Sequence, residues 1–146
     1  MDEQKYDALK LENQLCFPLY AASREVIKQY RPYLDALDLT YTQYITMMVF
    51  WEIEKINVKE LGKRLFLDSG TLTPVLKSLE KKGFVKRYRS QDDERVLMVE
   101  ITDKGSKLKE KALSVPPALA SCIKLEPNEA IELYKLLYKV LSSFEE

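Results

Sequence analysis

The stretch DSGTLTPVLKSLEKKG, residues 68–83, predicts a helix that carries small hydroxyl side chains at its front. Apolar residues recur at helical spacing and form the stripe expected to face the core: Leu72, Val75, Leu76 and Leu79. Pro74 fits this helix because first-turn amides have no partner within it. Gly83 follows two lysines and supplies the left-handed residue that ends the helix. The remaining side chains are expected to face solvent: Thr71, Thr73, Lys77, Ser78 and Lys81.

Elements on both sides of this helix complete a winged helix. Asn57 and Glu60 form the pattern of a capped helix over 58–65, and a short turn containing Asp68 joins it to the stretch above. Residues 84–89 and 95–101 are predicted to form two strands, and the polar residues 90–94 between them make the pair a hairpin. This order predicts a winged helix-turn-helix over about residues 41–102.

The amino-terminal part predicts two further helices. Helical spacing runs from about residue 9 to 33, and Pro18 within it predicts either a kink or a helix that begins close to Cys16. Thr40 and Gln43 form a capping box for a second helix through Trp51. That helix is apolar nearly all round, so we expect it to be buried.

The carboxyl-terminal part predicts a long helix capped by Thr102 and Asp103 and broken near the prolines at 116 and 117. Glu126 and Pro127 start a last helix with abundant apolar residues: Ile131, Leu133, Leu136, Leu137, Val140 and Leu141. A small winged-helix core cannot cover this surface. We therefore expect a homodimer, with helices from about 1–40 and 103–146 at its interface. The alternative is that these helices pack on their own domain.

The fold class is thus mainly α with a small β-hairpin wing, in a single domain over residues 1–146. The chain has no histidine and two cysteines, which excludes Ser-His-Asp and Cys-His catalysis and disfavours a zinc site. Its four glycines form no phosphate-binding motif, so we expect no cofactor and no metal. A membrane span and a signal peptide are both missing from the sequence, and we expect a cytoplasmic protein without a membrane partner.

A local basic excess points to double-stranded DNA as the partner. Residues 59–95 hold ten Lys and Arg against six Asp and Glu, although the whole chain is neutral. Hydroxyl side chains at a helix front suit base edges and phosphates, and an arginine at a wing tip suits a narrow minor groove. The candidate contacts are Ser69, Thr71, Thr73, Lys77, Lys86, Arg87, Arg89 and Arg95, with Asp93 bracing Arg95. The alternative is a hairpin with ordinary surface charge.

The quoted stretch, with Arg87, Arg89 and the segment Asp92-Asp93-Glu94-Arg95, resembles the recognition helix and wing of the MarR family. The amino-terminal segments LENQLCF, residues 11–17, and Leu39-Thr40-Tyr41 further resemble its OhrR branch, repressors that sense organic hydroperoxides. The resemblance covers nearly the whole chain and weakens after about residue 113. It implies a dimeric MarR-like architecture and a pseudo-palindromic operator.

Cys16 is the candidate sensor of such an oxidant. A lone cysteine is most often inert packing, and reactivity needs donors, cations or a helix amino end near the sulfur. The resemblance implies that Tyr30 and Tyr41 of the partner subunit hydrogen-bond the sulfur, with Tyr20 one turn along its own helix. It also leaves two roles open for Cys122. We interpret Cys122 as a spectator, with a low-molecular-weight thiol forming the disulfide; the alternative is that Cys122 closes an intersubunit disulfide.

The preferred hypothesis is that the protein is a redox-sensing transcriptional repressor, which hydroperoxide releases from its operator. The alternative is a MarR-type regulator gated by a small phenolic ligand, with Cys16 structural. A third reading, a thiol peroxidase, is disfavoured because no Arg or His lies beside Cys16 in the sequence. An enzyme turns over peroxide, whereas a sensor consumes about one equivalent and loses its DNA.

Overall fold

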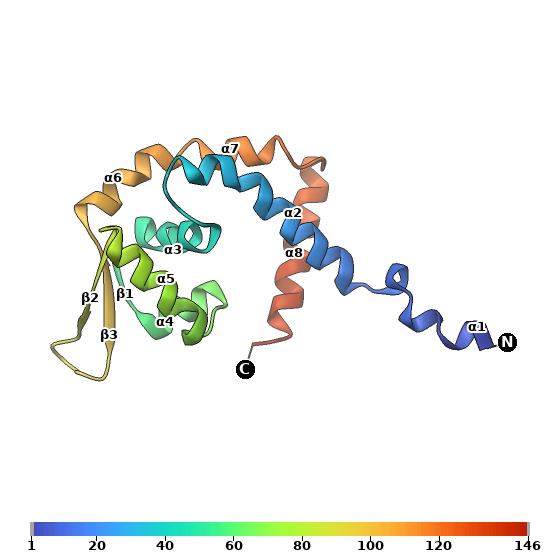
Figure 1. Ribbon diagram of the computed structural model, residues 1–146, viewed down its shortest axis with the longest axis horizontal. Coiled ribbons are helices and arrows are strands. Elements are labelled where there is room, and N and C mark those ends of the chain that lie inside the picture. Colours follow the sequence, from blue (N-terminus) through green and yellow to red (C-terminus); the bar gives the residue numbers. More distant parts are fainter. Residues whose placement is uncertain (1, 146) are drawn as a thin grey trace. The chain divides into compact units, whose positions relative to one another are not determined.

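A three-stranded antiparallel sheet lies beside a group of helices and ends in a long hairpin loop (Figure 1). The computed structural model describes residues 2–145, and the chain divides into two compact units, Met1–Val115 and Pro116–Glu146. The elements of the first unit are α1 (Asp2–Lys5), η1 (Asp7–Leu9), η2 (Leu11–Asn13), α2 (Cys16–Asp35), α3 (Tyr41–Glu52), β1 (Lys55–Asn57), α4 (Val58–Leu65), α5 (Ser69–Lys81), β2 (Val85–Arg89), β3 (Leu97–Ile101) and α6 (Asp103–Ala112). Two helices follow: α7 (Val115–Ala120) and α8 (Pro127–Ser142).

Side-chain caps set the beginnings of the helices. Thr40 and Gln43 form the predicted reciprocal capping box at the start of α3. Asn57 and Asp68 accept a hydrogen bond from the backbone N–H three residues on, and so fix the starts of α4 and α5. Gly83 has a φ of +84°, the left-handed conformation that ends α5. The predicted helix-turn-helix is therefore confirmed to within a residue or two at each end.

The sheet has the strand order β1-β3-β2, with β3 in the centre. Val85 pairs with Ile101 and Arg89 with Leu97, which confirms the predicted hairpin. Strand β1, which pairs Ile56 with Val99, was not predicted. Its three residues are too few to show an alternating pattern, and the helix cap at Asn57 follows at once. This strand fixes the hairpin to the amino end of α4.

The core of the first unit lies where α3, α4 and α5 meet the sheet. The predicted stripe of α5 is buried at Leu72, Leu76 and Leu79, while Val75 is only half-buried. Each fully buried leucine contributes about 1.5–3 kcal/mol of transfer free energy. Helix α3 is buried along most of its length, as predicted, but Met48 is exposed, so the predicted burial is wrong at that position.

Two predicted helix boundaries are confirmed, one with a changed role for its prolines. Helix α2 begins at Cys16, one of the two outcomes predicted from Pro18. Leu11 lies in a short 3-10 turn before it, and Leu15, which directly precedes the helix, is 86% exposed. The break predicted near the prolines falls just before them, at Leu113 and Ser114, and Pro116 and Pro117 lie in the first turn of α7. Proline lacks an N–H, and first-turn residues need no intrahelical partner, so both prolines start a helix here.

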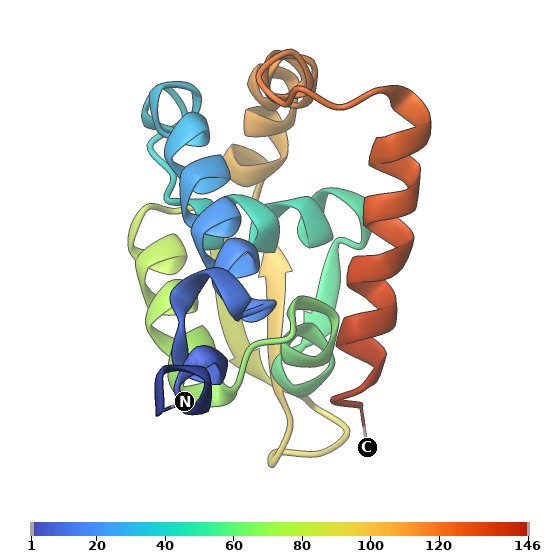
Figure 2. The same cartoon turned by 90° about the vertical axis from the view of Figure 1, so that its right-hand side faces the viewer.

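In the second unit, α8 is one continuous helix, drawn in red in Figure 2. Glu126 and Glu129 form the capping box at its start, and Pro127 is its first residue, as predicted. Tyr134 and Tyr138 contact each other, with ring centroids 4.7 Å apart. Large apolar side chains are exposed along the helix: Ile131, Leu133, Tyr134, Leu136, Tyr138 and Val140.

Candidate functional site

The front of α5 presents backbone N–H groups and small side chains. Asp68 Oδ1 accepts a hydrogen bond from Thr71 N at 2.7 Å, and this backbone bond lowers the pKa of the Asp68 carboxyl. Ser69 and Thr71 are exposed, as is Lys77 two turns further on. Thr73 is half-buried, and its hydroxyl donates to Ser69 O at 2.7 Å. Three of the four predicted contacts on this helix are therefore freely exposed, and Thr73 keeps only acceptor capacity.

Ser78 does not face solvent, contrary to the sequence-based prediction. Its hydroxyl oxygen accepts a hydrogen bond from Gln43 Nε2 at 2.8 Å, and the residue is half-buried against α3. Ser78 lies next to Val75 in the helical rotation, at the edge of the apolar stripe. A position at such an edge can turn to either side, and the buried amide of Gln43 provides the partner that turns it inward.

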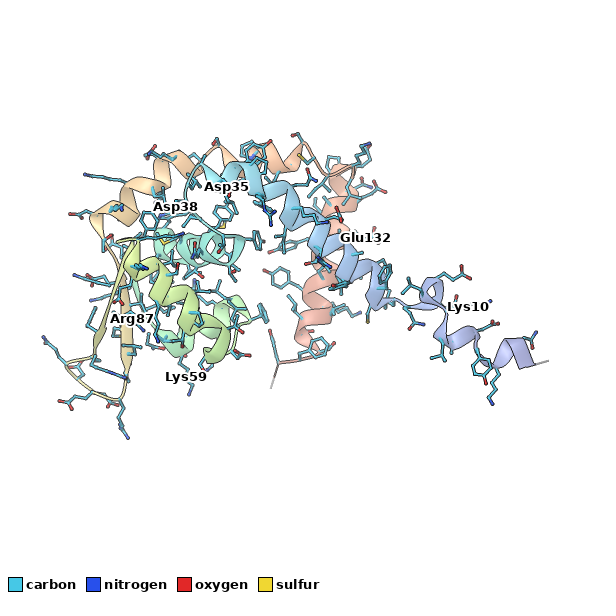
Figure 3. All side chains as sticks on the ribbon, viewed as in Figure 1. Lys10, Asp35, Asp38, Lys59, Arg87 and Glu132 are labelled. Carbon is cyan, nitrogen blue, oxygen red and sulfur yellow. The ribbon has the colours of Figure 1, made fainter. Side chains whose placement is uncertain are left out.

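The side chain of Arg87 lies against the recognition helix. It is 23% exposed, and its Nη2 and Nε lie 3.0 and 3.3 Å from Glu80 Oε1. The Arg87 backbone N–H also donates to Glu80 Oε2 at 3.2 Å. These bonds lower the pKa of Glu80 and connect β2 to α5. Arg87 is labelled in Figure 3. Arg87 thus connects the wing to the recognition helix, a role that the sequence did not predict.

The other basic side chains of the wing are exposed. Lys86 forms an ion pair with Glu100 at 3.0 Å, and this bond raises the pKa of Lys86. Arg89 donates to the backbone oxygen of Arg95 at 3.4 Å, across the hairpin. The predicted interface residues Lys86 and Arg89 therefore lie on the same hairpin as the wing tip, and both remain accessible.

Arg95 at the wing tip is 90% exposed and held by Asp93, as predicted. Its Nε and Nη2 donate to the two carboxylate oxygens of Asp93 at 3.1 and 3.2 Å. The Arg95 backbone N–H donates to the same carboxylate at 3.0 Å, and the Arg95 side-chain bond is the main cause of the lowered pKa of Asp93. Asp93 therefore orients the guanidinium before any partner arrives.

Cys16 is the first residue of α2, and its thiol is exposed. Tyr20 lies one turn along, where its hydroxyl accepts a hydrogen bond from Arg24 Nη1 at 3.0 Å. Among the described residues, no hydrogen bond joins the Cys16 sulfur to Tyr30 or Tyr41. An open pocket near the start of α2 is lined by Lys10, Leu11, Glu12 and Phe17. One chain thus leaves the thiol accessible.

Tyr30 and Tyr41 lie together, with ring centroids 4.9 Å apart and an interplanar angle of 56°. Tyr44 joins them at 5.7 Å from Tyr30 and contacts Trp51 in turn. Burial raises the pKa of Tyr30. Burial is also the larger cause of the raised pKa of Tyr41, and the nearby Tyr30 is the smaller one. Both hydroxyls therefore stay protonated near neutral pH and can donate hydrogen bonds. Tyr44, which the sequence did not single out, extends this cluster into the core.

Cys122 lies in the second unit, in the turn after α7, and its thiol is exposed. Its sulfur donates to Ala118 O at 3.4 Å. Within residues 2–145, no cluster of three acidic or thiol side chains is placed to hold a metal ion. No helix of the described part is both long and apolar enough to cross a membrane.

Comparisons with known proteins place this chain among bacterial regulators. A family model described as transcriptional regulator SarA/Rot matches residues 28–112. The chain is 47% identical over 141 residues to the organic hydroperoxide resistance transcriptional regulator of Bacillus subtilis, covering 97% of this chain and 96% of that protein. It is also 50% identical over 127 residues to the regulator SarZ of Staphylococcus saprophyticus, covering 87% of each chain.

Solved structures agree with these sequence matches. One of them is reduced AbfR bound to DNA; AbfR is a protein of Staphylococcus epidermidis. This structure matches with a TM-score of 0.77 at 35% identity, and the match covers 98% of this chain and 99% of the AbfR chain. A mutant MarR from E. coli complexed with operator DNA has a TM-score of 0.79 at 28% identity, covering 87% and 93%. The predicted winged-helix architecture and the resemblance stated from the sequence are both confirmed.

Proposed function

The chain belongs to the MarR family of winged-helix transcriptional regulators, in the OhrR branch, and we propose that it is a DNA-binding repressor switched by organic hydroperoxide. The observation that carries the proposal is the exposed Cys16 at the first turn of α2, in a chain matched over 97% of its length by a hydroperoxide resistance regulator. The relatives are regulators and not enzymes.

The proposed DNA contacts divide into two groups. The first group lies on α5, which would enter the major groove of a half-site: the exposed Ser69, Thr71 and Lys77 and the half-buried Thr73. Lys86, Arg89 and Arg95 extend the basic surface along the wing toward backbone phosphates and the minor groove. Two copies on a pseudo-palindromic operator would read half-sites about one helical turn apart.

The homodimer is proposed from the exposed apolar side chains at both ends of the chain. Leu11, Leu15 and Leu19 are exposed near the thiol, and α8 exposes six more large side chains. Exposed apolar surface on this scale marks an interaction site. A second copy of the chain would cover it with residues from about 1–40 and 103–146. Sedimentation that shows a monomer at micromolar concentration would contradict the proposed dimer.

The proposed oxidation step is a nucleophilic displacement. The Cys16 thiolate attacks the distal oxygen of the hydroperoxide, the O–O bond breaks, and the alkoxide leaves as the alcohol after taking up a proton. Cys16 becomes a sulfenic acid, oxidised by two electrons, and the peroxide is reduced by two. A small thiol then displaces water to give a mixed disulfide. Tyr30 and Tyr41 of a second copy would donate hydrogen bonds to the thiolate and lose them on oxidation. A protein that binds chromosomal DNA works in the cytoplasm, where such thiols are reduced.

The test compares trapped sulfenic acid and operator binding in the same samples. A dimedone adduct on Cys16, found by peptide mass spectrometry after one equivalent of cumene hydroperoxide, should coincide with loss of operator binding. Cys122→Ser separates the two fates of the sulfenate. With a small thiol present, a spectator Cys122 predicts a wild-type response in this variant. Without a small thiol, a resolving Cys122 predicts that the wild type forms an intersubunit disulfide on a non-reducing gel, whereas the variant forms none and stops at sulfenic acid or overoxidises. A response that survives in Cys16→Ser would contradict the proposal and favour the ligand-gated alternative.

A further inference from the structure

A buried polar network joins the start of α3 to the end of α5. Gln43, 5% exposed, accepts hydrogen bonds at Oε1 from Thr40 N at 3.0 Å and from Lys82 Nζ at 2.9 Å. Its Nε2 donates to Ser78 Oγ at 2.8 Å. One carboxamide thus bonds the first turn of α3, the last turns of the recognition helix and the residue that follows it.

Lys82 extends the network to the turn before α3. Its Nζ donates to Asp38 O at 2.6 Å and lies 3.7 Å from Asp38 Oδ1. Asp38, labelled in Figure 3, has a φ of +58°, a conformation unusual for a residue other than glycine. The lysine therefore holds a turn whose backbone is itself set in one sparsely populated conformation.

Such a network fixes geometry more strictly than apolar contact does. Leucines that pack across a helix interface can slide with a gradual loss of contact, but a buried amide that loses its partner incurs the full desolvation penalty. Hydrogen bonds that involve a charged group, such as Lys82 to Gln43, are the stronger kind. The position of α5 relative to the start of α3 is therefore tied to intact geometry at Gln43.

The same turn of α3 carries one of the tyrosines of the proposed sensor. Tyr41 is the first residue of α3, two residues before Gln43, and its ring contacts Tyr30 on α2. Any displacement of Tyr41 moves the backbone of the capping box, because Thr40 and Gln43 bond each other across it. We propose that Gln43 and Lys82 are positioning residues that transmit the state of the Tyr30–Tyr41 pair to the recognition helix; this inference rests on the proposed redox function.

In the reduced protein the network is intact and holds α5 in its DNA-reading position. Oxidation of Cys16 withdraws the hydrogen bonds of the tyrosines, and the shift at Tyr41 reaches Ser78 and Lys82 through the Gln43 amide. A switch of this kind operates only if the two states differ in contacts, and the network supplies that difference. Gln43 is buried, so its side chain is not available to contact the oxidant or the DNA.

The test is the ratio of operator Kd values between the oxidised and reduced protein, measured beside the rate of Cys16 oxidation. Gln43→Met keeps an unbranched side chain of similar length and removes all three bonds. Its ratio should fall by roughly fivefold or more, within the range typical of coupling between sites. Its rate of dimedone-trapped Cys16 oxidation should stay at the wild-type value. Gln43→Glu should restore most of the ratio, because a carboxylate keeps the two acceptor bonds and Ser78 can donate to it.

Thr46→Val is the matched control for simple destabilisation. Thr46 is also buried on α3, but its hydroxyl donates to Thr42 O at 2.7 Å within its own helix. This variant should lower the unfolding midpoint and leave the ratio unchanged. If Gln43→Met does not fold, Ser78→Ala tests the same link from α5, and a fall in its ratio supports the inference.

Suppose that the wild type releases the operator on oxidation and that the Gln43→Met and Ser78→Ala variants release it equally well. This result would overturn the inference about Gln43 and leave the proposed function standing. A wild type that keeps its operator affinity after oxidation overturns both the proposed function and this inference.

Discussion

The winged helix and the end of α2 that carries Cys16 differ in one respect. In the winged helix the charged side chains find partners within the same chain, whereas near Cys16 the thiol and the apolar side chains are left uncovered. In the wing, Arg95 is held by Asp93 and Arg87 by Glu80. At the start of α2, Cys16 is exposed beside uncovered apolar residues such as Leu15. One chain is therefore enough to build the proposed DNA reader, whereas the proposed sensor needs a second chain. Four predictions test this contrast, from the largest expected effect to the smallest.

The largest effect is expected from breaking the dimer. Ile131→Glu with Leu136→Glu places two carboxylates among the exposed apolar residues of α8 and should give a monomer. Operator affinity should fall by about 10²–10⁴-fold, because the two half-site contacts are no longer linked. Lys135→Glu with Lys139→Glu adds the same number of carboxylates at polar positions of the helix and should stay dimeric. A dimer in sedimentation for the first pair would show that this face is not the interface.

Removal of the wing-tip arginine comes next. Arg95→Ala should weaken operator binding by about 1–3 kcal/mol and lower the slope of log affinity against log salt by about one. Asp93→Ala should show a smaller loss with the slope unchanged, since the charge of Arg95 remains and only its orientation is lost. Fluorescence anisotropy across a salt series measures both quantities. Wild-type affinity in both variants would show that the wing tip does not contact DNA.

A smaller effect is expected at the connection between wing and recognition helix. Arg87→Met should cost about 1 kcal/mol of operator binding with no change in salt slope, because the charge is already neutralised by Glu80. Glu80→Gln should reproduce that defect, and the double variant should be no worse than either single one. If Arg87 instead contacts DNA directly, as the sequence predicts, Arg87→Met should lower the slope and Glu80→Gln should bind the operator more tightly. The salt series distinguishes the two roles.

The smallest effect concerns acid stability. The hydrogen bond from Arg87 holds the pKa of Glu80 below its ordinary value of 4.5. The contribution of Glu80 to stability is thus complete above that ordinary value and disappears as the pH falls through the lowered pKa of the folded state. Urea midpoints between pH 6 and pH 3 should fall less steeply in Glu80→Gln than in wild type. Glu110→Gln, an exposed carboxylate on α6, is the control; equal slopes in all three proteins would argue against the Glu80–Arg87 connection.

The sequence predicts the fold well wherever the signal is local. The caps at Thr40 and Asn57 and the glycine stop at Gly83 act within one turn of the chain, so the residues alone place these helix ends. Asp68 was predicted only as part of a turn, and the structure shows that it caps α5. Strand β1 was not predicted, because it is only three residues long and is defined by its pairing with β3. The 3-10 turns before Cys16 were not predicted either. Their apolar residues have the spacing of a helix, but a single chain leaves these residues exposed and they do not form one.

Side-chain roles are harder to predict, since they depend on partners far along the chain. The sequence shows that Arg87 is basic, but not that Glu80 lies within 3.0 Å of it. Gln43 is recognisable as a capping residue, yet its bonds to Ser78 and Lys82 span more than thirty residues of sequence. Asp93 and Arg95 are the exception, since the two are neighbours on one turn and their pairing could be predicted.

The most direct test of the redox account is a titration of operator-bound protein with cumene hydroperoxide, followed by anisotropy. The wild type should release its operator in proportion to the oxidant added, reaching completion near one equivalent per Cys16, and a thiol reductant should restore binding. Cys16→Ser should bind the operator when untreated and keep it throughout. Release from Cys16→Ser, or a wild type that consumes many equivalents while staying bound, would contradict the account.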